Sequence, residues 1–246
     1  MLADPSIYAV ALLAAFLIGM SKAGFSGISL ISVFLFADIY GAKASVGLAL
    51  PLLIAADLMA LPAFLKYGSW KPVWKLLGPA LVGLGIAWWM LGTMSDASAR
   101  KWIGGCILLM VVLQAARKVV PRMAERVSGS PTFGMMAGVM GGFATMLANA
   151  AGPVIQLYLA AREIPKMELI GIGARFFLVI NLLKLPLNSS LALITPASLW
   201  ENVLLLPGVI CGILFGKWLI HHVSQRAFEW MIVVFALVAG VRLVVG

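Results

Sequence analysis

Long apolar runs with almost no charge constrain the fold of this sequence most strongly. Six of them are about twenty residues long, the length that an α-helix needs to cross a bilayer core of about 30 Å. Hydrophobic residues make up 63% of the chain and charged residues 11%, whereas soluble domains are about one quarter charged. These properties predict an all-α polytopic membrane protein. The six runs are residues 43–65, 72–93, 100–120, 167–187, 199–220 and 227–245.

Two further apolar segments, residues 8–37 and 132–161, are interrupted by glycine and polar residues. The interruptions read SKAGFSG at 21–27 and LANAAGP at 147–153. Each arm is predicted to have about 10–15 residues, so as a helix it spans roughly 15–22 Å and reaches only the middle of the hydrocarbon core. We therefore expect each segment to be a re-entrant or broken helical hairpin that returns to the side from which it entered.

The distribution of Lys and Arg separates two possible topologies. If each broken segment crosses once, the loops carry eight basic residues on one side and seven on the other. If each is a hairpin, one side carries four and the other eleven, a bias typical of cytoplasmic loops. The hairpin topology predicts that both termini are periplasmic. It also explains the net charge of +9 by membrane orientation, so we expect no nucleic-acid partner.

The two halves of the sequence show a faint internal similarity. Residues 47–62 align without gaps on residues 171–186, and Asp57 then falls on Asn181. Each half consists of a hairpin followed by three crossings, and three crossings place the second half upside down relative to the first. We therefore predict two inverted repeats with eight hydrophobic segments. The first repeat is residues 1–120, the second is 132–246, and a basic linker at 121–131 joins them.

Inverted repeats with broken helices are typical of transporters, whose binding site lies near the middle of the membrane where the breaks meet. The second arms are expected to begin at Ser26-Gly27 and Gly152-Pro153, and amides at a helix start attract anions. Close helix packing is the alternative role for the glycines, and an interfacial position or a salt bridge is the alternative for Lys22. The candidate substrate-binding residues are Ser21, Lys22, Gly24, Ser26, Gly27, Asn149, Ala151, Gly152, Gln156 and Arg175.

Polar residues inside the predicted crossings add a second set of candidates. Arg175 and Asp57 lie at similar depth, and an isolated charge there is unfavourable. The two side chains could pair with each other, Arg175 could bind the substrate, or Asp57 could carry a coupling proton or sodium ion. Asn181 is included with Asp57 as a coupling residue. Lys184 lies on the helix face opposite Arg175, and we expect it to extend to the membrane surface.

The sequence contains no pattern typical of an enzyme. We find no HExxH motif, no Ser/His pair on one helix and no cluster of metal ligands. We therefore expect no catalytic residues, no cofactor and no metal.

The segments GMSKAGFSG and LANAAGP, together with the apolar layout of the whole chain, resemble those of the sulfite exporter TauE/SafE family, also called the toluene sulfonate uptake permeases. The resemblance implies transport of sulfite, organosulfonates such as sulfoacetate, or related small anions across a bacterial inner membrane. Secondary transport with alternating access is the mechanism we expect. An anion channel and a cation-coupled carrier of carboxylate or sulfate are the alternatives. The oligomeric state is left open.

Overall fold

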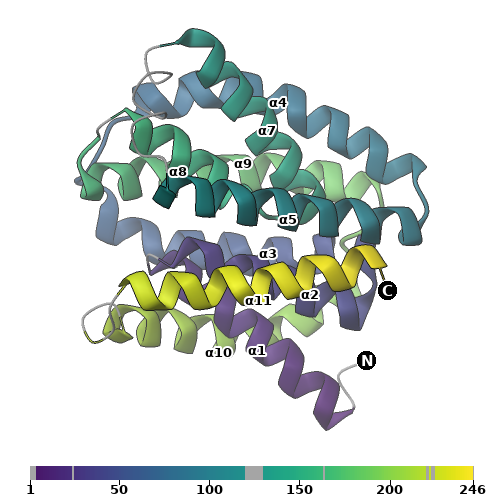
Figure 1. Ribbon diagram of the computed structural model, residues 1–246. Coiled ribbons are helices and arrows are strands. Elements are labelled where there is room, and N and C mark those ends of the chain that lie inside the picture. The colour runs from purple at the N-terminus through teal and green to yellow at the C-terminus, as the bar shows by residue number, and fades with distance from the viewer. Residues whose placement is uncertain are drawn as a thin grey trace.

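The computed structural model describes residues 4–23, 25–119, 130–162, 164–219, 222 and 225–245, and this part of the chain is helical without a strand (Figure 1). Most of the predicted linker at 121–131 lies outside the described residues. The helices are α1 (Pro5–Lys22), α2 (Ser29–Tyr40), α3 (Ala42–Ala60), α4 (Trp70–Thr93), α5 (Asp96–Val119), α7 (Pro131–Ala148), α8 (Gly152–Ala161), α9 (Lys166–Ser190), α10 (Pro196–Leu219) and α11 (Gln225–Val245), with 3-10 turns η1 (Ser26–Ile28) and η2 (Leu61–Phe64).

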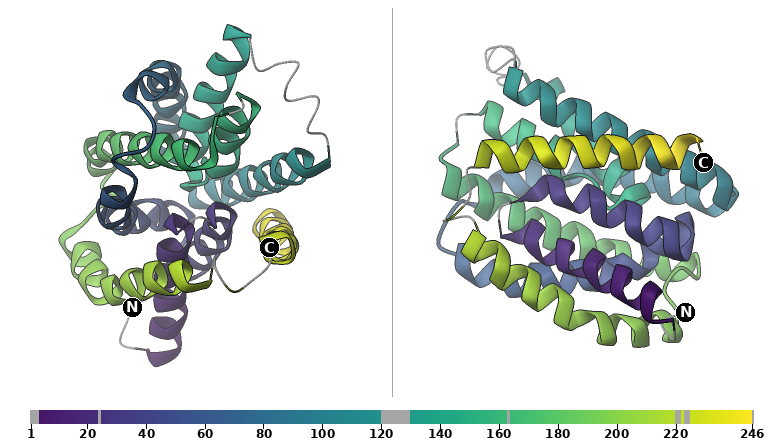
Figure 2. Two further views of the ribbon diagram at one scale, coloured as in Figure 1. Left: turned by 90° about the vertical axis from the view of Figure 1, so that its left-hand side faces the viewer. Right: turned by 60° about the horizontal axis from the view of Figure 1, so that its bottom comes forward.

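Most helices run side by side between two ends of one bundle (Figures 1 and 2). We call one of them the terminal end, because it carries both chain termini and the α4–α5 turn. The other, the distal end, carries the α3–α4 and α8–α9 connections (Figure 1). Five helices in the described residues are long and apolar enough to cross a membrane. They are Pro5–Lys22, Ala42–Phe64, Trp70–Thr93, Met167–Ser190 and Pro196–Leu219.

The two interrupted segments form the hairpins α1–α2 and α7–α8. The second break lies inside its predicted interval, whereas at the first the 3-10 turn η1 comes before α2, which begins at Ser29 rather than at Ser26-Gly27. The first arms have 18 residues each, and the second arms have 12 and 10. The predicted arm length of 10–15 residues is therefore wrong for α1 and α7, which span roughly 27 Å. Both helices begin before the apolar run, because a proline in the first turn follows a suitable cap. The carboxylate of Asp4, for example, accepts a hydrogen bond from the Ser6 amide at 2.8 Å.

The long arms run obliquely and cross other helices at very short range (Figure 1). Helix α1 packs on α10, and α7 packs on α4. A Cβ atom at Gly19 or Gly212 would collide with the backbone of the opposite helix in the first crossing. Gly142 and Gly83 occupy equivalent places in the second. Small residues that let two backbones approach are typical of helix packing in membranes.

The centre of the bundle is formed by α3 and α9, which contact each other; α3 also contacts both hairpins, and α9 contacts the second hairpin through α8. Helix α5 packs against α11 on one side of this centre. Leu30, Val46 and Phe176 are buried in the hydrophobic core. The breaks of both hairpins lie next to α3, because Lys22 at the first pairs with Asp57 and Asn149 at the second donates to Val46 O.

Candidate functional site

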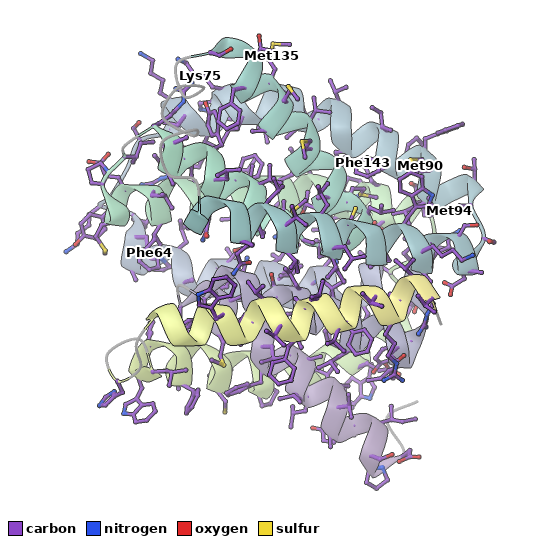
Figure 3. The ribbon with its side chains drawn as sticks, viewed as in Figure 1. Phe64, Lys75, Met90, Met94, Met135 and Phe143 are labelled. Atoms are coloured by element: carbon purple, nitrogen blue, oxygen red, sulfur yellow. The ribbon has the colours of Figure 1, made fainter. Side chains whose placement is uncertain are left out.

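A cavity of about 460 Å³ lies between the two hairpin breaks, α3 and α9. Its apolar walls include Phe64, Leu159 and Phe177. Phe64 lies at the distal end and Met94 lies at the terminal end (Figure 3), so the cavity extends from the breaks toward the distal end. The polar side chains that line it are Ser21, Lys22, Ser29, Asp57, Gln114, Thr145, Asn149, Gln156 and Asn181.

Lys22, the last residue of α1, supplies a positive charge to the cavity wall. Its Nζ lies 2.7 Å from Oδ1 of Asp57, and Asn181 Nδ2 donates to the other carboxylate oxygen at 2.8 Å. The Asp57 side chain is 2% exposed and that of Lys22 is 14% exposed. The ammonium also lies 5.1 Å from the centre of the Phe177 ring. Lys22, rather than Arg175, is thus the ionic partner of Asp57; both residues line the cavity, and Lys22 is the more exposed of the two.

Arg175 lies among backbone carbonyls near the distal end. Its Nη1 donates to Tyr67 O at 2.6 Å, and its Nη2 donates to Leu65 O at 2.5 Å. A further bond joins Nη1 to Gly171 O at 2.9 Å, one turn earlier on α9. Arg175 does not belong to the cavity lining, and these bonds attach the α3–α4 connection to α9. Its role in substrate binding stays a prediction that we do not carry into the proposed site.

Lys184 departs from its expected position, because it is fully buried and does not reach the membrane surface. Its Nζ donates to Thr145 O at 2.7 Å and lies 2.5 Å from Asn149 Oδ1 and 3.3 Å from Thr145 Oγ1. The face of α9 opposite Arg175 therefore meets the end of α7 rather than lipid. Sequence reasoning missed this residue as a site candidate, although its spacing of three from Asn181 places both on one helix face.

Asn149 shapes the second break through both its backbone and its side chain. It has φ 51° and ψ 29°, a left-handed conformation that Asn tolerates better than most residues. Its side-chain Nδ2 donates to Val46 O of α3 at 3.2 Å, while Oδ1 meets Lys184. Helix α8 then begins at Gly152 with a proline in its first turn and no side-chain cap. The start of α8 therefore presents uncapped backbone at the cavity wall.

The first break brings Gly27 close to Gln114 of α5, a residue that we did not predict. A Cβ at Gly27 would lie 2.5 Å from the Gln114 amide, so a larger residue there would displace the end of that side chain. The Oε1 atom of Gln114 and the Oδ1 atom of Asn181 have no hydrogen-bond partner among the described residues. The cavity wall thus holds two acceptors as well as a cation.

Most of the predicted site residues line the cavity, and the others do not. Ala151 is buried as the N-cap of α8 and is not part of the lining. Ser26 begins η1, but its side chain lies outside the described part of the chain, as does the whole of Gly24. The predicted residues that line the cavity are Ser21, Lys22, Gly27, Asp57, Asn149, Gly152, Gln156 and Asn181.

The cavity wall carries hydrogen-bond donors beside the Asp57 carboxylate. It combines the Lys22 ammonium, amide and hydroxyl side chains and the start of a helix. Within the described residues, no group of three His, Cys, Asp or Glu side chains could hold a metal ion.

The apolar helices are those of a multi-pass membrane protein, and the polar cavity lies among them. The sequence model of the sulfite exporter TauE/SafE family matches residues 8–243, nearly the whole chain, and the chain therefore belongs to that family. Membership confirms the resemblance noted from the sequence and indicates a membrane transporter of sulfur anions. No curated protein and no solved structure matched the chain.

Proposed function

We propose that the protein is a secondary transporter of sulfite or small organosulfonates such as sulfoacetate, and that it binds its substrate in the cavity between the hairpin breaks. The single observation that carries this proposal is the partly exposed Lys22 ammonium at the cavity wall. A sulfonate or sulfite oxygen could replace Asp57 as a partner of Lys22, and charge-assisted hydrogen bonds of this kind are the strong ones. Asn149, Gln156 and the start of α8 surround the same space.

We also propose that residues 1–120 and 132–246 are inverted repeats of four hydrophobic segments each, joined by the basic linker at 121–131. The helix contacts support this. In the repeat, α1 corresponds to α7 and α4 corresponds to α10, so the α1–α10 contact and the α7–α4 contact are equivalent. The α3–α9 and α5–α11 contacts each join helices that would be equivalent. The hydrogen bond between Asp57 and Asn181, which are aligned in the sequence, is the arrangement expected next to a two-fold axis.

The repeat arrangement suggests alternating access with the cavity open toward the cytoplasm. The cavity extends toward the distal end, which we propose is cytoplasmic because the basic loops are concentrated there. Both termini would then be periplasmic in a bacterial inner membrane. To test this, single cysteines at Lys43 and Lys166 are labelled in intact cells, after the native Cys106 and Cys211 have been replaced. Only the cysteine at position 43 should react with a reagent that cannot cross the membrane, and labelling of both would contradict the topology.

Binding to the purified protein tests the substrate class. Calorimetric titration with sulfite, sulfoacetate, sulfate and acetate should give the highest affinity for the first two anions. Lys22→Gln should weaken binding at least tenfold, since it removes a charge-assisted hydrogen bond of about 1.5–3 kcal/mol. Lys71→Gln is the control, because Lys71 is exposed on α4 away from the cavity. Equal affinities of Lys22→Gln and the parent would show that the anion binds elsewhere.

Flux into proteoliposomes separates a carrier from the alternative of an anion channel. A carrier that alternates between two states should saturate with rising sulfite concentration and should exchange labelled for unlabelled substrate. Flux that rises linearly with concentration and shows no exchange would identify a channel. The Asp57→Asn variant measures whether a proton or sodium dependence of flux requires this carboxylate.

A further inference from the structure

Among the described residues, Lys184 has no carboxylate partner, whereas Lys22 pairs with Asp57. Lys184 is fully buried, and the three oxygens around its Nζ belong to the neutral groups of Thr145 and Asn149. Asp57, the acid at the site, already pairs with Lys22. The ammonium form of Lys184 therefore lacks the counter-charge that a buried ammonium requires.

The other charged groups on helices packed against α3 and α9 do not supply that counter-charge. Asp38 of α2 pairs with Arg100 and Arg242, and Asp96 of α5 binds the amides at the start of α3. Helices α7 and α8 carry no charged residue, and Arg175 is held by carbonyls. The remaining charged residues on these helices whose side chains the structure describes are all at least partly exposed. They are Lys43, Lys71, Lys75, Lys101, Glu168, Glu201 and Lys217.

The geometry around Nζ suits both protonation forms of Lys184. As an ammonium, the group donates to Thr145 O, Asn149 Oδ1 and Thr145 Oγ1, which uses all three of its hydrogens. As a neutral amine, it still donates to the two carbonyl-type oxygens, and its lone pair accepts from the Thr145 hydroxyl. Between the ammonium and the amine form, only the hydroxyl hydrogen of Thr145 has to rotate. Lys184 can therefore gain or lose a proton without a change in packing.

Thr145 and Asn149 also connect Lys184 to the bound substrate, because both side chains line the cavity. Lys184 thus lies one layer of side chains behind the space in which the anion is proposed to bind. A negative charge there provides the counter-charge that the ammonium otherwise lacks. Binding of the anion and protonation of Lys184 stabilise each other through this short separation.

We infer that Lys184 takes up one proton when the substrate anion binds, so that the anion and a proton occupy the site together. This inference rests on the proposed function and extends it to the coupling ion. The proton comes from solvent and forms an N–H bond with the Nζ lone pair, which converts the amine to an ammonium. A monovalent anion and a proton together carry no net charge, so the membrane potential does not oppose their joint movement.

Calorimetry of methanesulfonate binding to the full-length protein in nanodiscs tests the inference. Methanesulfonate remains a monovalent anion across the pH range, so proton uptake must come from the protein. Titrations in two buffers of different ionisation enthalpy, neither of them an anion, count the protons bound. The parent should take up close to one proton per anion above neutral pH, and its affinity should fall about tenfold per pH unit there.

Three variants identify the group that takes the proton. Lys184→Met should bind without proton uptake and without the pH dependence. Asn149→Asp places a carboxylate beside Nζ, so Lys184 stays protonated and the uptake should also vanish, even if Lys184→Met does not fold. Asp57→Asn should keep the uptake, and Lys71→Met is the control for loss of a surface lysine. Uptake that persists in Lys184→Met or Asn149→Asp, or that disappears in Asp57→Asn, would overturn the inference.

The same titrations distinguish this inference from the proposed function. A parent that binds methanesulfonate without taking up a proton contradicts the role of Lys184 and leaves the anion site standing. A parent that binds neither methanesulfonate nor sulfite contradicts the proposed function itself.

Discussion

The two hairpin breaks occupy matching places in the bundle but carry different chemistry. The first break ends α1 with Lys22, whose charge is balanced by Asp57 from α3. The second ends α7 with Asn149, a neutral residue whose Oδ1 contacts Lys184 from α9. One break therefore brings its own cation, and the other receives a cation from a neighbouring helix.

In the proposed pair of inverted repeats, this difference gives the site two distinct sides. An anion between the breaks would meet a lysine that already has a counter-ion on one side and a lysine without one on the other. The first can exchange its partner for the substrate, and the second can respond by protonation. The four predictions below test this comparison, in order of decreasing expected effect.

The helix crossings should be equally intolerant of larger side chains in the two halves. Gly83→Val and Gly212→Val would each force a side chain into the backbone of the opposite helix, and we expect each to lose more than about 3 kcal/mol of stability. Thermal unfolding followed by size-exclusion chromatography measures this. Gly85→Val is the matched control on α4, because open space surrounds that position, and its effect should stay below about 0.5 kcal/mol. A large loss for only one of the two crossing variants would break the equivalence.

Removing the counter-ion at the first break should destabilise the protein because it leaves Lys22 unpaired. We expect Asp57→Asn to lose about 3 kcal/mol, at the lower end for a buried pair since Lys22 is partly hydrated. Combining it with Lys22→Gln should recover part of the loss. Thermal unfolding of the two single variants and the double variant measures the coupling. Additive losses would mean that the ion pair contributes little to folding.

The second break should depend on Asn149 for two separable reasons. Asn149→Ala loses both the contact with Lys184 and the tolerance of a left-handed backbone, so we expect a loss of about 2 kcal/mol. Asn149→Gly keeps the backbone conformation accessible and should lose about 1 kcal/mol. The difference between the two melting temperatures measures the backbone contribution. Equal losses would show that the side-chain contact alone matters.

Arg175 should affect stability without affecting anion binding. Arg175→Lys keeps the charge but cannot reach all the carbonyls that the guanidinium binds, so we expect a loss of about 1 kcal/mol. The affinity for sulfite, measured by calorimetry on the folded variant, should equal that of the parent. A fall in affinity would return Arg175 to the binding site.

Local properties of the chain were sufficient to predict most helices, the two breaks and many of the residues that line the cavity. Apolar runs of about twenty residues have few stable folds other than membrane helices, because the bilayer leaves no other way to satisfy the backbone. The glycines and polar residues at 21–27 and 147–153 interrupt this pattern in the sequence itself. Lys22 and Asn149 could therefore be chosen as site residues without any knowledge of packing.

The partners of the buried charges could be decided only by the tertiary structure. Asp57 and Arg175 have similar depth in the sequence pattern, yet Asp57 pairs with Lys22 while Arg175 binds carbonyls. The spacing of nine residues correctly placed Lys184 opposite Arg175 but could not show that this face of α9 meets α7. Helical periodicity determines which residues share a face, whereas the tilt and rotation of each helix, which determine what that face touches, depend on close crossings between residues far apart in the chain.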